Sequence, residues 1–278
     1  MLYIERTTTL YGTGFEQIDF STDGQLVAAG NEQNVNLYHV MTGEVVESYT
    51  HESTVQHVSL SADSRYLASS GFNENIIIRD RLSGEIILTT QSSASSPMVW
   101  HPTENRIFIG AGVVLDIDDL DNPLLLSTWG FVYDAEWSPD GRFVATANGW
   151  DNDYGSIFDA TTGERIFTFW TNSNLAWASD SNRIASQTQI RDITADETVL
   201  FIPELDGHIA WHPTQPWLTG TSEGVLSIWD SDSGDLLTEY QTDCDAIRGI
   251  DIHENKIALS CQLFEPYSID LLILEILP

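Results

Sequence analysis

Residues 134–170 read DAEWSPDGRFVATANGWDNDYGSIFDATTGERIFTFW, and this stretch decides the fold. A short apolar segment ends at Trp137, and three more follow it at residues 142–146, 156–159 and 164–169. The segments are separated by Ser-Pro-Asp-Gly, by a polar loop and by Thr-Gly-Glu. Short apolar runs bounded by Gly, Asn, Asp and Ser are typical of β-strands, and a glycine such as Gly163 permits a tight hairpin turn. The stretch therefore predicts four short strands.

The same unit recurs along the whole chain. The bulky residue that ends the first strand and precedes a polar turn lies at Phe20, Leu60, Trp100, Trp137, Trp177, Trp211 and Ile252. Successive positions are 34 to 41 residues apart. A period near 40 residues with four short strands per unit is typical of a propeller blade. The sequence therefore predicts an all-β fold: a seven-bladed β-propeller with four antiparallel strands per blade, in a single domain.

The two ends of the chain predict how the ring closes. We expect blades at about 12–52, 53–92, 93–129, 130–170, 171–207, 208–244 and 245–278, the last completed by residues 1–11. The final unit lacks a fourth strand, whereas residues 2–10 read as a strand that no other unit uses. We therefore expect residues 2–10 to pair with residues 268–276. Such closure removes the exposed sheet edges that invite aggregation.

Local motifs point to a known family. The chain contains Ser138-Pro-Asp-Gly-Arg142, the dipeptide Trp229-Asp230, the pair Gly207-His208 and a histidine, His51, at the corresponding place of an earlier unit. With these motifs the chain resembles the WD-repeat family of β-propellers over essentially its whole length. Only one unit keeps the Trp-Asp dipeptide, so the buried Asp–His–Ser/Thr–Trp network that the resemblance implies is expected to be incomplete in most blades. The recurring tryptophans at the anchor position are expected in the core.

The charge balance excludes several classes of partner. The chain has 42 acidic and 11 basic residues, a formal net charge of −31, and a single lysine, Lys256. Phosphate contacts need clustered Lys and Arg, so direct nucleic-acid binding is excluded and docking on anionic membranes is disfavoured. An acidic surface could instead mimic nucleic acid and inhibit a basic protein. The acids are spread over all seven units and mostly occupy turn positions, which argues against such a mimic.

No group of residues marks a catalytic site, so we expect a protein without enzymatic activity or cofactor. Two cysteines, Cys244 and Cys261, are too few for a disulfide framework, and Cys261 is expected to be a small buried apolar residue of a strand. The N-terminus has neither the basic start nor the apolar run of a signal peptide. These observations lead us to expect a soluble, cytoplasmic protein.

The resemblance also supplies candidate binding residues. In the WD-repeat family, peptides and proteins commonly contact the rim where the first strands begin. The corresponding positions and nearby loop aromatics are Glu16, Gln56, Phe72, Tyr133, Trp150, Tyr154 and Arg248. Trp150 and Tyr154 stand out because aromatic side chains in a polar loop are costly to expose unless they bind something. The alternative is that they pack back onto neighbouring blades. The expected function is a non-catalytic protein-interaction scaffold or regulatory subunit of a larger complex, whose protein or peptide partner could carry a basic surface.

A calcium site is a further alternative. Asp151 and Asp153 flank Asn152 in a loop, and alternating oxygen ligands of this kind can hold Ca²⁺. The same residue types are favoured in turns for geometric reasons alone, and the full ligand count of a calcium loop is missing. A Ca²⁺-dependent ligand-binding propeller is therefore the third interpretation of the sequence.

Overall fold

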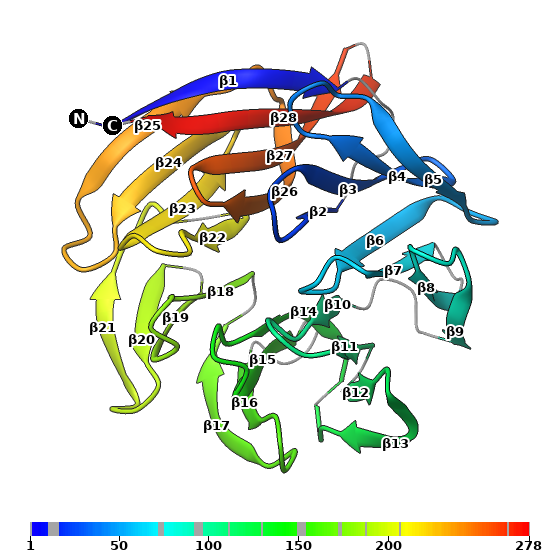
Figure 1. The fold of residues 1–278 in the computed structure, drawn as a ribbon. Coiled ribbons are helices and arrows are strands. Elements are labelled where there is room, and N and C mark those ends of the chain that lie inside the picture. The colour runs from blue at the N-terminus through cyan, green and yellow to red at the C-terminus, as the bar shows by residue number, and fades with distance from the viewer. Residues whose placement is uncertain are drawn as a thin grey trace.

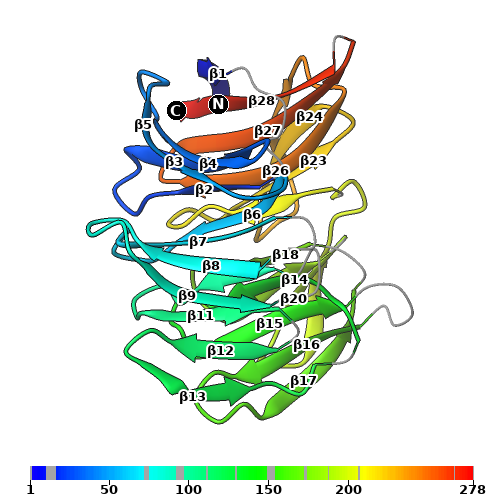
Figure 2. The ribbon, with the colours of Figure 1, turned by 90° about the vertical axis from the view of Figure 1, so that its right-hand side faces the viewer.

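The computed structural model describes residues 2–10, 17–71, 75–91, 97–110, 112–128, 130–148, 154–171, 174–186, 188–205, 207–265 and 267–277. These residues form seven four-stranded antiparallel sheets arranged in a ring (Figure 1) and no helix. The predicted fold class is confirmed. Figure 2, turned by 90°, shows the strands of successive sheets stacked on one another down the molecule.

Six sheets are built from consecutive strands. Blade 1 contains β2 (Ile18–Phe20), β3 (Leu26–Asn31), β4 (Asn34–His39) and β5 (Val45–Thr50). Blade 2 contains β6 (Val55–Leu60), β7 (Tyr66–Gly71), β8 (Asn75–Asp80) and β9 (Ile86–Gln91). Blade 3 contains β10 (Met98–Trp100), β11 (Arg106–Ile109), β12 (Val113–Asp116) and β13 (Asp119–Leu125). Blade 4 contains β14 (Val132–Trp137), β15 (Phe143–Asn148), β16 (Tyr154–Asp159) and β17 (Arg165–Trp170). Blade 5 contains β18 (Leu175–Trp177), β19 (Arg183–Ser186), β20 (Gln189–Asp192) and β21 (Glu197–Phe201). Blade 6 contains β22 (Ile209–Trp211), β23 (Trp217–Ser222), β24 (Val225–Asp230) and β25 (Leu236–Gln241).

The seventh sheet joins the two ends of the chain. Its order is β1 (Tyr3–Leu10), β28 (Tyr267–Leu277), β27 (Lys256–Phe264) and β26 (Ala246–His253), and we call it blade 7. The pairing of β1 with β28 runs from Tyr3 opposite Leu277 to Leu10 opposite Leu271, with a bulge near Arg6. Both termini lie at the same edge of the ring (Figure 1). Closure of the ring by the N-terminal strand is therefore as predicted.

The turns between the first and second strands are built by their own side chains. The hydroxyl of Ser138 donates to Asp140 and accepts the amide of Phe143, and Ser21 and Ser61 repeat this arrangement in blades 1 and 2. In blade 3 the same turn is held by His101, whose Nδ1 accepts the amides of residues 103 and 104. Short polar side chains of this kind satisfy backbone groups that the strands leave unpaired.

The hydrophobic core lies between neighbouring blades. Phe108 and Val114 of blade 3 pack with Trp137, Val144 and Phe158 of blade 4, and the other clusters repeat the pattern around the ring. The anchor tryptophans at 100, 137, 177 and 211 are all buried, as predicted from their recurrence. Because each blade buries one apolar face against the next, a single blade could not hold its fold alone.

Candidate functional site

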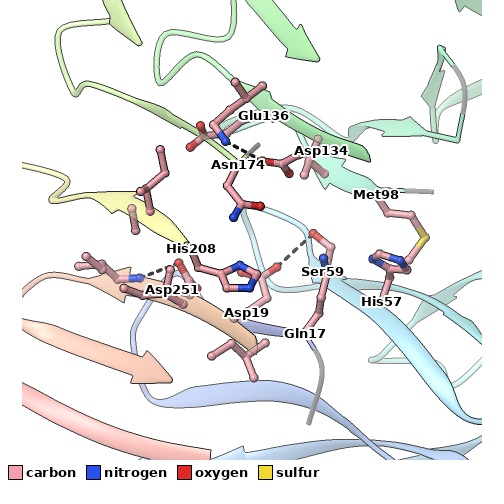
Figure 3. A pocket seen from close by; sticks show the side chains of 18 of the residues that line it. Gln17, Asp19, His57, Ser59, Met98, Asp134, Glu136, Asn174, His208 and Asp251 are labelled. Atoms are coloured by element: carbon pink, nitrogen blue, oxygen red, sulfur yellow. Dashed lines mark hydrogen bonds between the residues drawn. The ribbon is translucent and has the colours of Figure 1, made fainter. Parts of the chain in front are cut away.

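The first strands of all seven blades surround a central cavity of about 1420 Å³. We call the end of the ring where these strands begin the entry face, and the end with the turns after the first and third strands the turn face. The side chains that line the cavity include four carboxylic acids, Asp19, Asp134, Glu136 and Asp251 (Figure 3). Each is only partly buried by protein and also borders the cavity.

Each of these carboxylates accepts a hydrogen bond from the first strand of the next blade. Asp19 accepts the amide of Leu60 at 2.6 Å, and Asp251 accepts the amide of Phe20 at 2.7 Å. The second of these bonds crosses the point where the ring closes. In the same way the amides of Leu175 and Trp177 donate to Asp134 and Glu136, each at 2.8 Å. The innermost strand of a blade has a free edge, and these carboxylates satisfy its amides.

Tryptophans add hydrogen bonds in the same direction, from the first strand of one blade to the first strand of the preceding blade. The indole Nε1 of Trp100 donates to the carbonyl of Ser59 at 3.1 Å, and that of Trp137 donates to Val99 at 2.9 Å. Trp177 reaches the carbonyl of Glu136 at 3.2 Å. A buried indole normally finds such an acceptor. The recurrence of tryptophan at the anchor position therefore has a second role besides core packing, because it joins adjacent first strands.

The cavity changes the acidity of its ionisable groups. Burial raises the pKa of Asp134 to about 6, and burial with the nearby carboxylate of Asp134 raises the pKa of Glu136 well above its usual value. Burial and the neighbouring Asp251 likewise raise the pKa of Asp19. Burial lowers the pKa of His57 to about 4, so that imidazole is neutral at pH 7. Desolvation disfavours the charged form in every one of these cases.

The predicted rim residues are partly brought together at the cavity mouth. Gln56, Tyr133 and Arg248 line the cavity near the entry face. Arg248 donates from Nε to the side-chain oxygen of Gln262 at 2.7 Å. Tyr154 lies farther out, at the first position of β16, and is not among the cavity-lining residues. Glu16, Phe72, Trp150, Asp151 and Asp153 lie outside the residues that the structure describes, so the rim assignments for the first three and the calcium candidate remain predictions.

An exposed aromatic cluster marks the entry face of blade 4. Tyr154 pairs with Trp170 across β16 and β17, and the two rings meet edge to face at a centroid distance of 5.2 Å. Tyr154 is 41% exposed, Trp170 53% and Tyr133 52%. Tyr154 is thus exposed, and its ring contact is with Trp170 of its own blade and not with a neighbouring blade. It packs on its own blade and still presents an edge to solvent.

Sequence reasoning missed the carboxylates of the cavity. Asp19, Glu136 and Asp251 each stand one residue before the anchor, in a strand that is otherwise mostly apolar. A buried acid needs hydrogen-bond donors. The acidic residue that recurs one position before the anchor therefore indicated a polar contact inside the ring. The many acidic residues of the turns made this recurring position hard to distinguish in the sequence.

The buried polar network that the WD-repeat resemblance implies differs between blades. In blade 2, His51 Nε2 and the hydroxyl of Ser69 lie 2.9 Å apart in the interior. The equivalent hydroxyl of blade 4, that of Thr146, is buried without a hydrogen-bond partner among the described residues. The equivalent positions of blades 6 and 7 are Gly220 and Leu259, which carry no hydroxyl.

The two cysteines are paired, which corrects the expectation of an isolated buried thiol. Cys244 and Cys261 form a disulfide across 17 residues, with a Cα–Cα distance of 5.2 Å. Both are buried, as expected for Cys261. Cys244 precedes β26 and Cys261 lies in β27, so the hairpin brings them together although they are distant in sequence. Disulfides persist mainly in oxidising compartments, so this bridge does not favour the cytoplasmic location expected from the sequence.

The described residues hold neither a metal-binding cluster nor a membrane-spanning helix. They contain no group of three or more His, Cys, Asp or Glu side chains placed to hold a metal ion. Within the same residues, no helix combines the length and apolar character needed to cross a membrane.

Comparison with known proteins supports the architecture. Residues 43–80, 124–153 and 203–230 match the family model described as WD domain, G-beta repeat. These segments include first and second strands of blades 2, 4 and 6. No curated protein matches the chain. Three segments of the chain thus match WD40 repeats, and the described residues as a whole form a seven-bladed β-propeller arrangement.

Proposed function

We propose that the protein is a non-catalytic interaction scaffold or regulatory subunit that binds a protein or peptide partner on its entry face. WD40 propellers commonly mediate protein–protein interactions, and this gives the class of function. The observation that carries the choice of face is the exposed aromatic cluster of Tyr133, Tyr154 and Trp170. Aromatic side chains are enriched in binding hot spots because they bury a large area with few rotatable bonds.

The geometry of the entry face supports this proposal. Tyr133 lies at the cavity mouth, while Tyr154 and Trp170 lie toward the outer strands of the same blade. The cluster thus extends from the centre of the ring outward, and Gln56 and Arg248 offer polar contacts on other blades around the same mouth. An extended peptide could contact the aromatic cluster and the polar rim at once. A centre of aromatic contacts with a polar surround is the usual anatomy of an interface.

Affinity capture from native extract with matched variants tests the choice of face. Trp170→Ser and Tyr133→Ser each remove an exposed aromatic side chain from the entry face. Leu82→Ser removes an apolar side chain that is 84% exposed on the turn face, and serves as control. We expect both entry-face variants to recover at least tenfold less partner than wild type, with Leu82→Ser unchanged. Equal recovery by all folded variants, or loss only with Leu82→Ser, would overturn the proposal.

A further inference from the structure

Each blade has a free sheet edge at the outer rim of the ring, because its outermost strand pairs with a single strand among the described residues (Figure 1). Alternate residues of such an edge strand direct their backbone N–H and C=O groups away from the sheet, where another strand can pair with them. Natural proteins protect these edges with charged residues or proline. The outermost strands β1, β5, β13, β21 and β25 follow this rule, with the acids Glu5, Glu47, Asp119, Glu197 and Glu239 within their bounds.

The outermost strands of blades 2 and 4, β9 and β17, contain no acidic residue, although the chain has 42. The two strands differ in the side chains that they expose. β17 exposes Ile166 at 50%, Trp170 at 53% and Thr168 between them. β9 contains no aromatic residue, and its exposed large apolar side chain is Ile86. Of the outermost strands in the described part of the chain, β17 is therefore the least protected against pairing with another strand.

The exposed side chains of β17 form one apolar strip. Side chains alternate between the two faces of a strand, so Ile166, Thr168 and Trp170 share a face. The two phenylalanines between them pack in the apolar cluster that blade 4 forms with blade 5. Tyr154 lies opposite Trp170 on β16 and extends the strip inward. A free backbone edge beside an apolar strip matches the mode of recognition in which a peptide adds a strand to a sheet.

We propose that the partner binds blade 4 as a fifth strand by pairing an extended segment with the free edge of β17. This inference rests on the function proposed above and states the form of the partner's binding segment. The segment has apolar or β-branched side chains at alternate positions, because aromatic and β-branched side chains make favourable cross-strand pairs with residues such as Trp170. It has no proline among the paired residues, since proline lacks the N–H that the ladder needs.

The position and charge of this edge favour a different protein over a second copy of the chain. The strip is continuous with the aromatic cluster of the entry face, because Tyr154 and Trp170 belong to both. Two copies, each of charge −31, repel each other, so self-association through the edge is disfavoured. A partner segment without acidic residues meets no such repulsion from β17 itself.

An NMR titration of the full chain with an uncharged probe peptide tests strand addition. The probe is acetyl-Ser-Val-Thr-Val-Thr-Val-Ser-amide, whose binding owes nothing to attraction by the charge of −31. One derivative is N-methylated at its valines and another at its threonines. Each derivative loses the donors of one edge, because the N–H groups of successive residues in a strand point to opposite edges. Ile166→Ser and Trp170→Ser alter the strip, and Ile86→Ser, at an isoleucine 51% exposed on β9, is the matched control.

We expect the amide signals of residues 165–170 to shift with millimolar peptide, while those of β9 stay unchanged. One methylated derivative should bind about tenfold more weakly than the other, because it loses about two backbone hydrogen bonds. Ile166→Ser and Trp170→Ser should each raise Kd about threefold, since each removes a cross-strand side-chain contact. Ile86→Ser should leave Kd unchanged.

Equal binding of the two methylated derivatives would overturn strand addition, as would shifts centred on β9 or no shift at millimolar peptide. Sedimentation equilibrium of the free protein should show a monomer. A dimer that Ile166→Ser dissolves would overturn the inference by assigning the edge of β17 to a second copy. If strand addition fails while the captured partner still requires Tyr133 and Trp170, the function proposed above stands with another mode of contact.

Discussion

Replacing Asp134 by Asn should make the protein more stable than wild type at alkaline pH. The pKa of Asp134 is raised from 3.8 to about 6 by burial. The folded protein therefore binds a proton more tightly than the unfolded chain, and ionisation of this group costs stability as pH rises from about 4 to above 6. At about 1.4 kcal/mol per pKa unit, the cost reaches about 3 kcal/mol. Because Asp134 also borders the open cavity, solvent screening makes this value an upper bound.

Asn keeps the shape and one carbonyl acceptor for the amide of Leu175 but carries no charge. Urea unfolding at pH 5 and pH 8, followed by tryptophan fluorescence, measures the difference from wild type. About half of the cost has already developed at pH 5, so we expect the advantage of the variant to grow by about 1 kcal/mol between the two pH values. Asp118→Asn changes an exposed acid by the same charge and controls for net charge. An unchanged difference between pH 5 and pH 8, or a growing advantage of wild type, would refute the argument.

Three other perturbations test the ring itself. Deletion of residues 1–11 removes β1 from blade 7 and exposes the edge of β28, so the melting temperature should fall sharply; an unchanged value in calorimetry would contradict closure by β1. Cys244→Ser/Cys261→Ser, or addition of dithiothreitol to wild type, should reduce the free energy of unfolding by about 3 kcal/mol in urea titrations, the loop entropy that a bridge across 17 residues removes. No loss on reduction would argue that the bridge does not form. Raising NaCl from 20 to 500 mM should raise the melting temperature, because salt screens the repulsion of a chain of charge −31. A flat or falling curve would count against that repulsion.

The propeller could be predicted because the same four-strand sequence pattern occurs in seven successive units. One unit such as residues 134–170 is ambiguous, but the anchor residues from Phe20 to Ile252 recur with one period, and the unused strand at residues 2–10 accounts for ring closure. Burial of Trp137 and Trp177 followed from the same recurrence. Local turn chemistry and repeat spacing depend on residues close in sequence, so a single chain suffices to predict them.

The site could be predicted only in part, because its contacts join different blades. Asp19 contacts Leu60, and Asp251 contacts Phe20 across the ring closure. The disulfide between Cys244 and Cys261 depends on the register of a hairpin.

The most direct test of the central claim is an amide hydrogen-exchange footprint of the protein with and without its captured partner. The central claim is that a protein or peptide partner binds at the entry face. We expect new protection at the start of the first strands and in the connections that precede them, around Gln56, Tyr133 and Arg248, and at the Tyr154–Trp170 strand pair. The turns around Arg65, Arg142 and Leu82 should exchange as in the free protein. Protection confined to those turns, with the entry face unchanged, would contradict the account.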